Sequence, residues 1–444
     1  MIEFNLMETV NCRLLLLNNF ELLKLLAKIF SKTIDSCSIN LMLVYELYGG
    51  KVNKIKLLTI GIDASNIRRG GGVTHLVELL WALQPATFGI ERVVVWGGAL
   101  TLKALKDRPW LAKRNPPAQE SGLLKRTLWQ RYRLSQAARD EGCDVLFVPG
   151  GSYAGHFHPV VTMSQNLLPF EMPELRRYGF TFFTLKLLLL RFTQSRSFRQ
   201  TDGVIFLTEY ARNVVLSVTG KLSGKTCIVP HGLNPRFTMS PKQQRAFADY
   251  EEAHPYRVLY VSIIDQYKHQ WHVVEAVAAL RKEGLPVVLD LVGPDYPPAL
   301  KRLNETIDRV DEDRLWVNYH GAIPFDELHH KYAQADIGLF ASSCENMPNI
   351  LLETMAAGLP IACSRKGPMP DMLGDAGLYF DPEKPLEIAA ALRELISSPE
   401  WRMRLAQASY ERAQKYSWHR CASETFGFLA EIAQQKSGKR KKDV

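Results

Sequence analysis

Paired cysteines, metal-ligand clusters and nucleic-acid-binding motifs are all missing from this sequence of 444 residues. Its seven cysteines are scattered, their number is odd, and none forms a C-x-x-C pair. This pattern argues against a disulfide framework or a zinc site and favours a reducing compartment. No RNP-type aromatic motif, helix-turn-helix signal or zinc finger is present, so we expect no nucleic-acid partner. The formal net charge of +9 then suits an anionic membrane surface or an anionic substrate.

Long hydrophobic runs are also lacking. The apolar stretches at 14–17 and 22–30 are interrupted by polar residues, and neither reaches the ~20 residues that span a bilayer. The first fifty residues show no basic region ahead of an apolar run and no small-residue cleavage site, so they do not resemble a cleavable signal. They suit either an amphipathic interfacial helix or extra sequence ahead of the true start, and we favour the second because the globular pattern begins at Ile55.

Strand-like and helix-like segments alternate through the rest of the chain, which predicts parallel sheets covered on both faces. The first series has a helix at 73–83 and strands at 55–62, 92–96, 144–148, 159–163 and 203–207. The second has strands at 226–229, 257–261, 287–292, 315–319, 337–340, 360–363 and 378–380, with helices at 271–283, 298–310, 325–335 and 348–358. The predicted fold class is therefore α/β, with two doubly wound halves that join near residues 220–225 and face a central cleft.

The domain prediction follows from this alternation. Its parts are an N-terminal extension of uncertain role at 1–54, a first Rossmann-like domain at 55–224, a second at 225–405, C-terminal helices at 406–435 and a tail at 436–444. We expect the C-terminal helices to cross back to the first domain, and we expect the basic tail to be disordered.

Glu345 and Glu353 are the most informative pair of residues. Seven residues separate them, and Pro348 is suited to the first position of a helix that ends at Gly358. The start of a helix offers free N–H groups and a partial positive charge, which suit a phosphate. A carboxylate on either side can accept hydrogen bonds from sugar hydroxyls. The arrangement fits a nucleotide-sugar, although a first-turn Glu also serves simply as a partner for the helix dipole.

Two further loops carry candidate residues. Gly70-Gly71-Gly72 follows the first strand and opens a helix, where glycines allow close approach of a phosphate; a plain tight turn is the alternative. The motif is not G-x-G-x-x-G, so we expect no dinucleotide cofactor. Lys268 lies just past a strand end in the second half. It can neutralise a diphosphate leaving group, unless the loop faces away and the lysine is merely solvated.

We expect no metal ion. Asp311 and Asp313 form a D-x-D pattern, which can hold a divalent cation, but the turn after a helix explains these residues. The histidines at 156, 158, 329 and 330 lack a third ligand at metal-site spacing.

A hydrophobic and basic stretch runs from Arg176 to Arg199. Lys and Arg beside Leu and Phe suit a helix that lies on an anionic membrane, and the predicted contacts are Lys186, Arg191, Arg196 and Arg199. The alternative is a core helix whose basic side chains reach out to water.

Together these motifs resemble the retaining GT-B glycosyltransferases of family 4, and the bacterial O-antigen and lipopolysaccharide mannosyltransferases look closest. The resemblance runs from about Ile55 to Ala433. Besides the glycines, Lys268 and the two glutamates, it rests on Pro230-His231-Gly232-Leu233-Asn234-Pro235-Arg236-Phe237, Leu291-Val292-Gly293, His320-Gly321, Ala335-Asp336 and Gly374-Asp375-Ala376-Gly377.

The resemblance implies roles for individual residues. Glu345 would hold hydroxyls of the transferred sugar, and Glu353 would hold the ribose. Gly71 and Gly72 would approach the donor from the other domain. The phosphates would bind the backbone of Asn346, Met347, Pro348 and Asn349. It also implies a metal-independent reaction that retains the anomeric configuration, helped by the departing phosphate.

The chain departs from the family pattern at two places. The arginine expected five residues before Lys268 is Ile263, so phosphate neutralisation would rest more on Lys268 or on Arg365. The histidine expected after the fifth strand is replaced by Ser164, Gln165 and Asn166, which offer hydrogen bonds but no base. We include Gln165 and Asn166 with Glu345 and Lys268 as candidate catalytic residues.

The function predicted from the sequence is transfer of a hexose, with mannose from GDP-mannose as the best guess, to a lipid-linked saccharide in cell-surface polysaccharide synthesis. The expected partners are the nucleotide-sugar, that acceptor and the anionic inner-membrane surface, with the protein cytoplasmic and peripheral and without a cofactor. One alternative is a catalytically inactive scaffold or binding protein, motivated by the missing arginine. Another is a synthase that uses a soluble sugar acceptor.

Overall fold

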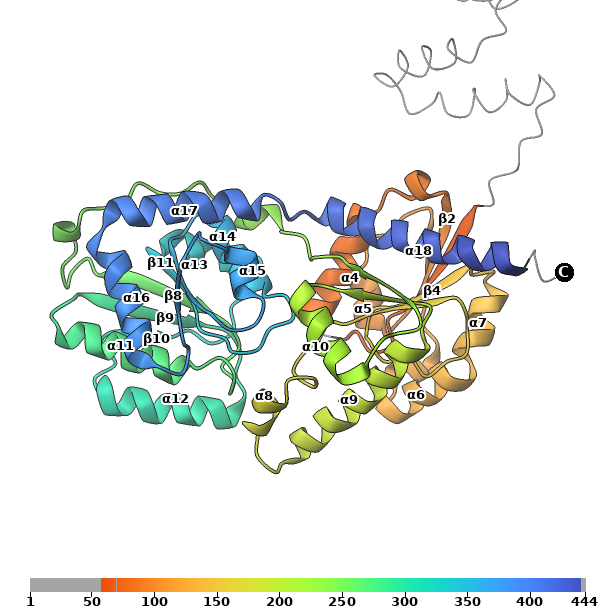
Figure 1. Ribbon diagram of the computed structural model, residues 1–444, viewed down its shortest axis with the longest axis horizontal. Helices are drawn as coiled ribbons and strands as arrows, with labels where there is room; N and C mark the ends of the chain where they lie inside the picture. Colours follow the sequence, from red (N-terminus) through yellow and green to blue (C-terminus); the bar gives the residue numbers. More distant parts are fainter. Residues whose placement is uncertain (1–56, 69, 441–444) are drawn as a thin grey trace, which may run out of the picture. The chain divides into compact units, whose positions relative to one another are not determined.

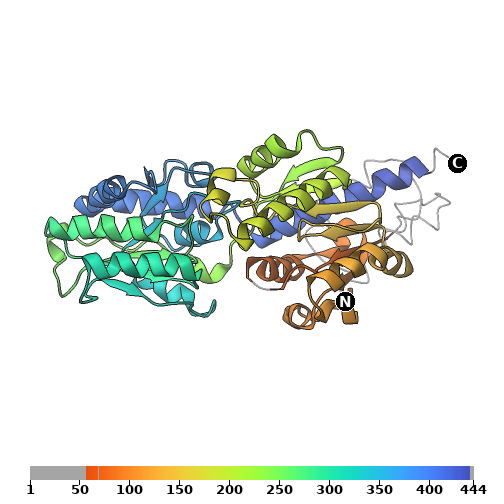
Figure 2. The same cartoon turned by 90° about the horizontal axis from the view of Figure 1, so that it is seen from below.

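The computed structural model describes residues 57–68 and 70–440, and the predicted N-terminal extension lies outside them. The described chain contains two parallel sheets with helices on both faces of each (Figures 1 and 2). Several central strands, such as β4 and β11, are buried at every position, as expected for strands covered on both sides. The predicted α/β class with two doubly wound halves is confirmed.

The first sheet has seven strands in the order β3-β2-β1-β4-β5-β6-β7. They are β1 Leu58–Asp63, β2 Ile90–Trp96, β3 Leu111–Arg114, β4 Val145–Val148, β5 Val160–Met163, β6 Gly203–Phe206 and β7 Lys225–Ile228. The short, half-exposed β3 was not predicted, because its sequence Leu-Ala-Lys-Arg has no apolar run. Strand β7 pairs in parallel with β6, so our assignment of this strand to the second half was wrong. The join between the halves comes after it.

Helices of the first half connect these strands. They are α4 Gly71–Ala82, α5 Ala99–Ala104, α6 Leu123–Tyr132, α7 Leu134–Asp140, α8 Met172–Arg176, α9 Phe182–Gln200 and α10 Glu209–Thr219, with short 3-10 turns at Pro85–Phe88 and Pro117–Glu120. Threonine begins two of them: Thr181 accepts from the N–H of Thr184, and Thr208 accepts from that of Ala211. Such caps satisfy N–H groups that the helix itself leaves unpaired.

The second sheet has six strands in the order β10-β9-β8-β11-β12-β13. They are β8 Tyr256–Val261, β9 Val287–Val292, β10 Val317–Tyr319, β11 Ile337–Phe340, β12 Ile361–Ser364 and β13 Leu378–Phe380. The helices are α11 Gln270–Lys282, α12 Pro297–Val310, α13 Leu328–Gln334, α14 Asn349–Ala356, α15 Met369–Leu373, α16 Pro385–Ser397 and α17 Pro399–Ala413, and 3-10 turns lie at Pro235–Phe237 and Phe247–Asp249. Each of these strands and four of the helices lie within a few residues of their predicted positions.

The chain passes between the halves twice, and the two passages lie side by side. Leu233 and Ser417 form an isolated parallel bridge, and a Cβ atom on Gly232 would lie 2.2 Å from the backbone nitrogen of Trp418. Only glycine fits at such a close approach. Helix α18, Trp418–Arg440, then packs on the first half, where Phe428 touches Gly203 and Glu431 pairs with Lys225 at 2.5 Å. The helix continues past the predicted boundary at residue 435, and residues 441–444 lie outside the described chain.

No helix within the described ranges combines the length and the apolar character needed to cross a bilayer.

Candidate functional site

The candidate site forms where the strand order of the second sheet reverses. Strands β8 and β11 are neighbours there, and the loops that follow them carry Lys268 and Glu345. In doubly wound sheets this reversal opens a crevice at the carboxyl ends of the strands, where ligands bind. The topology therefore explains how two residues far apart in the sequence come to the same place.

Lys268 and Glu345 form an ion pair between the Nζ and Oε1 atoms. Their side chains are only 7% and 15% exposed, so the pair is largely shielded from water. The ammonium group also lies 5.0 Å from the ring centre of Tyr267 and 5.3 Å from that of Phe340, which favours a cation there. The pair places one positive and one negative group together at the edge of the sheet.

The helix that follows Glu345 differs slightly from its prediction. Pro348 is the residue before the helix rather than its first residue, and α14 begins at Asn349. No side chain caps this start. The N–H groups of its first turn are therefore open to a ligand. The helix gives way at Ala357 to Gly358, which has a φ of 64°.

Glu353 lies on α14 and is buried, with 8% of its surface exposed. The Tyr332 hydroxyl donates to its Oε2 atom at 3.2 Å. Burial raises the pKa of the Glu353 carboxyl to about 8, so the group is mostly protonated at neutral pH. A protonated carboxyl both donates and accepts hydrogen bonds, as does a sugar hydroxyl.

The predicted residues of the first half lie at two neighbouring loops. Helix α4 starts at Gly71, and a Cβ atom on Gly72 would lie 3.4 Å from Oε1 of Gln165 in the loop after β5. The glycines thus keep space open beside Gln165. Asn166 is exposed, and its Oδ1 accepts from the N–H of Leu168 at 3.1 Å. Its side chain therefore supports a local turn.

Asn346 connects the two groups of residues. Its Nδ2 donates to the carbonyl oxygen of Ser164 at 2.8 Å, and its own carbonyl accepts from the Thr208 hydroxyl at 2.8 Å. The backbone N–H of His231 lies 3.0 Å from the sulfur of Met347. The loop that contains Glu345 is therefore held directly against the loop that contains Gln165.

Two side-chain acceptors beside the start of α14 are buried without a partner. These are the Oδ1 atoms of Asn346 and Asn349. Buried polar atoms are nearly always hydrogen-bonded, and leaving one unpaired costs about 1–3 kcal/mol. A ligand that donates hydrogen bonds, such as a sugar, would relieve this cost.

Two of the predicted membrane contacts have other partners. Arg191 donates to the carbonyls of Pro169 and Phe170, both at 3.1 Å. Arg199 donates to the carbonyls at the end of α10, those of Thr219 at 3.0 Å and Val218 at 3.4 Å. These guanidinium groups make hydrogen bonds within the fold, and their role as membrane contacts stays a prediction. Lys186, Arg196 and Arg199 are exposed, whereas Arg191 is partly buried.

Several other candidates also have structural roles. Arg365 pairs with Glu387 at 2.8 Å, and its part in phosphate neutralisation stays a prediction. Asp311 accepts from three backbone N–H groups between 2.8 and 3.1 Å, those of residues 315–317, as helix-end turn chemistry predicts. His158 pairs with Asp202 at 2.6 Å. Within the described ranges, no three His, Cys, Asp or Glu side chains gather closely enough to hold a metal ion.

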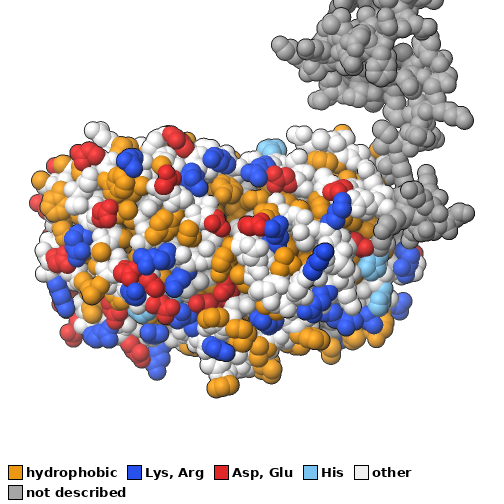
Figure 3. All heavy atoms as spheres, viewed as in Figure 1, with side chains coloured by type: hydrophobic (Ala, Val, Ile, Leu, Met, Phe, Trp, Pro, Cys, Tyr) orange, Lys and Arg blue, Asp and Glu red, His pale blue; other side chains and the backbone are white. Residues whose placement is uncertain are grey.

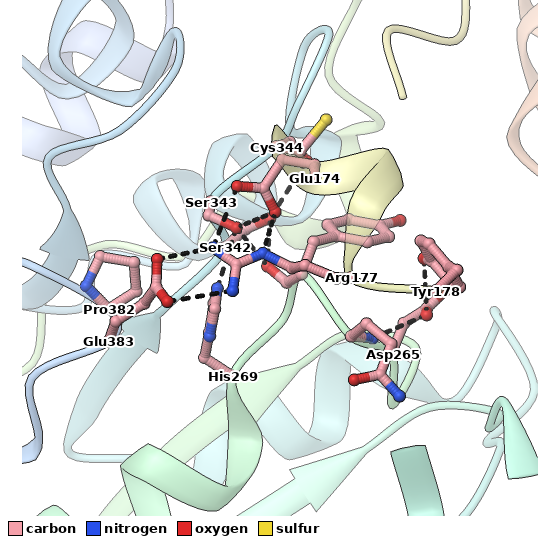
Figure 4. Close-up of polar contacts among 12 residues, drawn as sticks. Glu174, Arg177, Tyr178, Asp265, His269, Ser342, Ser343, Cys344, Pro382 and Glu383 are labelled. Carbon is pink, nitrogen blue, oxygen red and sulfur yellow. Dashed lines mark hydrogen bonds and ion pairs between the residues drawn. The ribbon is translucent and has the colours of Figure 1, made fainter. Parts of the chain in front are cut away.

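Two clusters of polar side chains were not predicted from the sequence. One joins α8 to the second half through Glu174, Arg177 and Ser343 (Figure 4). The other places His75 of α4 edge-on to His231, with their Nδ1 atoms 2.9 Å apart, beside Trp418. The i, i+3 spacing of Glu174 and Arg177 was a weak signal for a local pair. Nothing in the sequence indicated partners so distant along the chain.

The two doubly wound halves have the form of the GT-B fold, and comparisons with known proteins agree. Residues 255–398, which lie in the second half, match the family described as "Glycosyl transferases group 1". The predicted resemblance to family 4 glycosyltransferases is confirmed.

Individual relatives extend the similarity. An "O-antigen chain mannosyltransferase B" of Escherichia coli is 31% identical over 110 residues, which cover 25% of this chain and 29% of that protein. A "GDP-mannose-dependent alpha-(1-6)-phosphatidylinositol dimannoside mannosyltransferase" of Mycobacterium tuberculosis (strain ATCC 25177 / H37Ra) is 25% identical over 245 residues, which cover 54% and 61%. The chain thus spans less than two thirds of the length of either protein.

Among solved structures, the chain is similar to WaaG, "a glycosyltransferase involved in lipopolysaccharide biosynthesis". The TM-score is 0.61 at 14% identity, and the match covers 84% of this chain and 99% of that one. Similarity at this level of identity establishes the shared fold.

Proposed function

We propose that the protein is a retaining glycosyltransferase that moves a hexose from a nucleotide-sugar to a lipid-linked saccharide. The observation that carries the proposal is the shielded Lys268–Glu345 pair beside the uncapped start of α14. A diphosphate with a sugar at each end matches this array of one cation, free N–H groups and two carboxyl groups. Mannose from GDP-mannose is the favoured donor, because the relatives described above include mannosyltransferases.

In this proposal Lys268 and the first N–H groups of α14 bind the diphosphate. They stabilise the negative charge that grows on it as the bond to the sugar breaks. Binding the diphosphate draws Lys268 away from Glu345, whose carboxylate is then free to accept from hydroxyls of the transferred sugar. Glu353 binds the ribose in place of Tyr332. The reaction needs no metal ion because the lysine and the helix start carry the leaving-group charge.

Retention of configuration requires the acceptor to attack from the side that the diphosphate leaves. The departing phosphate then takes the proton of the acceptor hydroxyl, so no protein base is required. Gln165 offers an amide rather than a base beside Gly72, in keeping with this scheme. It is suited to hold a sugar hydroxyl in position.

The acceptor is placed at a membrane surface by the face that α6 and α9 present. Both helices contact the loop at 152–154: Gln130 of α6 donates to the Ser152 carbonyl at 3.3 Å, and Ser197 of α9 accepts from the N–H of Tyr153 at 2.8 Å. Large apolar side chains on these helices and just before α9 are 40% or more exposed, namely Leu123, Leu124, Leu128, Tyr132, Phe180, Phe182, Leu185, Leu188, Leu189 and Phe192. Hydrophobic side chains gather at the lower edge of the molecule, where α9 lies (Figure 3).

The two helices that carry these exposed apolar side chains are also rich in basic residues. Helices α6 and α9 contain seven Lys and Arg residues and no Asp or Glu. Apolar side chains flanked by basic ones suit the boundary of an anionic lipid layer. This supports a protein that lies on the cytoplasmic side of the inner membrane, with Lys186 and Arg196 among the contacts.

Donor turnover tests the proposal. The full-length protein would be incubated with GDP-mannose and, separately, UDP-glucose, together with a lipid extract that supplies acceptors, and nucleoside diphosphate release would be measured. We expect release with one donor, increased by the extract. Folded protein that binds neither donor in a thermal-shift assay and releases no diphosphate would contradict the proposal and favour an inactive scaffold.

A further inference from the structure

Helix α8 of the first half, with the two residues that follow it, makes polar contacts with the second half at three places (Figure 4). All three are hydrogen bonds or ion pairs made by side chains, and they lie beside a hydrophobic cluster that includes Leu175 and Cys344. They are the Arg177 guanidinium to Glu383 at 2.6 and 3.0 Å, the Tyr178 hydroxyl to Asp265 at 2.8 Å, and the Ser343 hydroxyl to Glu174 at 2.6 Å. Arg177 also donates to Glu174 at 2.7 Å, so one carboxylate receives both the arginine and the serine.

Ser343 is the centre of the third contact. Its Oγ lies 2.9 Å from Nε2 of His269. The hydroxyl has one proton, which it donates to Oε2 of Glu174, so the serine oxygen accepts from Nε2–H of His269. Burial lowers the pKa of His269 to about 3, so the imidazole is neutral and this tautomer is fixed. A directional chain therefore runs from His269 through Ser343 to Glu174.

This hydrogen-bonded chain starts from residues next to the Lys268–Glu345 pair in the sequence. His269 is the residue after Lys268, and Ser343 is two residues before Glu345. The N–H of Ser343 donates to the Tyr267 carbonyl at 2.8 Å, which ties the two loops together. His269 has a φ of 53°, an unusual conformation for a non-glycine residue that persists only where surrounding contacts enforce it.

We propose that Glu174 is a positioning residue for glycosyl transfer: through Ser343 and His269, it aligns the Lys268–Glu345 pair from the opposite half of the molecule. Arg177 holds Glu174 in place and anchors it to the second half at Glu383. This inference rests on the proposed function for its catalytic consequence, while the alignment itself is a property of the two loops.

Through this hydrogen-bonded chain, the geometry of the Lys268–Glu345 pair depends on contact between the two halves. Glu174 reaches Ser343 only while α8 lies against the second half, so separation of the halves removes the support behind both loops. A donor that binds to the second half alone then meets a misaligned pair. Coupling of this kind protects a reactive donor from water until the site is assembled.

Kinetics distinguish positioning from a general role in folding. Glu174→Ala and Ser343→Ala should each lower kcat for the turned-over donor by about 10- to 100-fold, as displacement of a reacting group by about 1 Å does. KM for the donor should change by less than about threefold, because both variants retain the groups that bind it. The double variant should be about as slow as either single variant, because the two residues act in one chain. Glu174→Gln, whose amide oxygen still accepts from Ser343, should recover part of the rate.

Glu171→Ala provides a matched control. Glu171 directly precedes α8 and accepts from the Tyr210 hydroxyl at 2.5 Å, but Tyr210 belongs to the same half. This variant removes a half-buried acid that makes a comparable hydrogen bond, and it leaves Ser343 untouched. Its kcat should match that of the parent.

Hydrogen–deuterium exchange tests the alignment without requiring activity. The amides of Lys268 and Ser343 donate to carbonyls within the two loops, at 3.0 and 2.8 Å. Both amides should exchange faster in Glu174→Ala and Ser343→Ala than in the parent or in Glu171→Ala. Unchanged exchange in these loops would overturn the inference, and so would parental kcat in both variants. An inactive parent whose loop exchange nevertheless responds to Glu174→Ala would overturn the proposed reaction and leave the positioning role standing.

Discussion

At the scale of single residues, the two glutamates of the site differ in their surroundings. Glu345 pairs with Lys268, whereas Glu353 is buried beside Tyr332 and has a raised pKa. The spacing of seven residues was visible in the sequence, but this difference was not. It implies that the two side chains have separate roles and that substitutions at them will have different effects.

Replacing each glutamate in turn should separate transfer from binding. Glu345→Ala should lower kcat on the order of 100-fold, because it removes a charge aligned with the reacting sugar. Glu353→Ala should weaken donor binding about tenfold, which corresponds to about 1.4 kcal/mol. Titration calorimetry with GDP-mannose and steady-state kinetics would measure both effects, with Glu312→Ala, an exposed turn residue, as the control. Two variants that bind and turn over the donor like Glu312→Ala would refute the site assignment.

Glu353 should also make stability depend on pH. The folded protein keeps this carboxyl protonated up to about pH 8, whereas the ordinary pKa is 4.5. The protonated Glu353 carboxyl contributes to the free energy of unfolding. That contribution is fully present below pH 4.5 and is lost as the pH rises to about 8. At about 1.4 kcal/mol per pKa unit, the loss is on the order of 5 kcal/mol. The side chain in Glu353→Gln is neutral at every pH, so the stability of this variant should not show that loss.

Urea denaturation of the parent and of Glu353→Gln at about pH 5 and about pH 8.5 checks this expectation. The parent should lose stability relative to the variant at the higher pH. Equal changes in the unfolding free energy of both proteins would show that Glu353 ionises normally.

At the scale of elements, α9 shows how one helix serves two purposes. Leu187 and Phe198 face the core, and Arg191 and Arg199 bind carbonyls of the fold. Phe182, Leu185, Leu189 and Phe192 are exposed and follow one side of the helix at spacings of three and four residues. The near-continuous apolar sequence could not distinguish these faces.

Charge reversal on the exposed face should weaken vesicle binding. The double variant Lys186→Glu/Arg196→Glu should bind anionic phospholipid vesicles at least about tenfold more weakly, since each basic residue near such a surface contributes about 1 kcal/mol. Sedimentation with vesicles measures this effect. Lys282→Glu/Lys301→Glu changes the net charge equally on the second half and should bind like the parent. Equal binding by both double variants would argue against the α6–α9 face.

At the scale of the whole molecule, the fold was predicted more completely than the contacts between its halves. Buried parallel strands have characteristic apolar runs, so most of them were located from the sequence within a few residues. Strand β7 was assigned to the wrong sheet because its four residues Lys-Thr-Cys-Ile fit either neighbour. Its position is settled by its parallel pairing with β6, the strand before it in the chain.

In the site too, contacts between distant parts of the chain were not predicted from the sequence. The motifs around Gly72, Lys268 and Glu345 were identified because each lies in a loop after a strand, and parallel sheets bring such loops to one edge. The contact between Asn346 and Ser164 was not predicted, nor was the chain from Glu174 to His269. Both depend on how one half meets the other.

The sequence by itself determined the class of fold, the loops that carry the chemistry and the residue types available there, because these follow from local periodicity and from strand order. Only the tertiary structure decided the partners: Lys268 with Glu345, Glu353 with Tyr332, and Arg191 with backbone carbonyls. A side chain's charge state and role depend on burial and on neighbours that come from distant parts of the chain. Those neighbours are defined once the sheets have packed and the two halves have met.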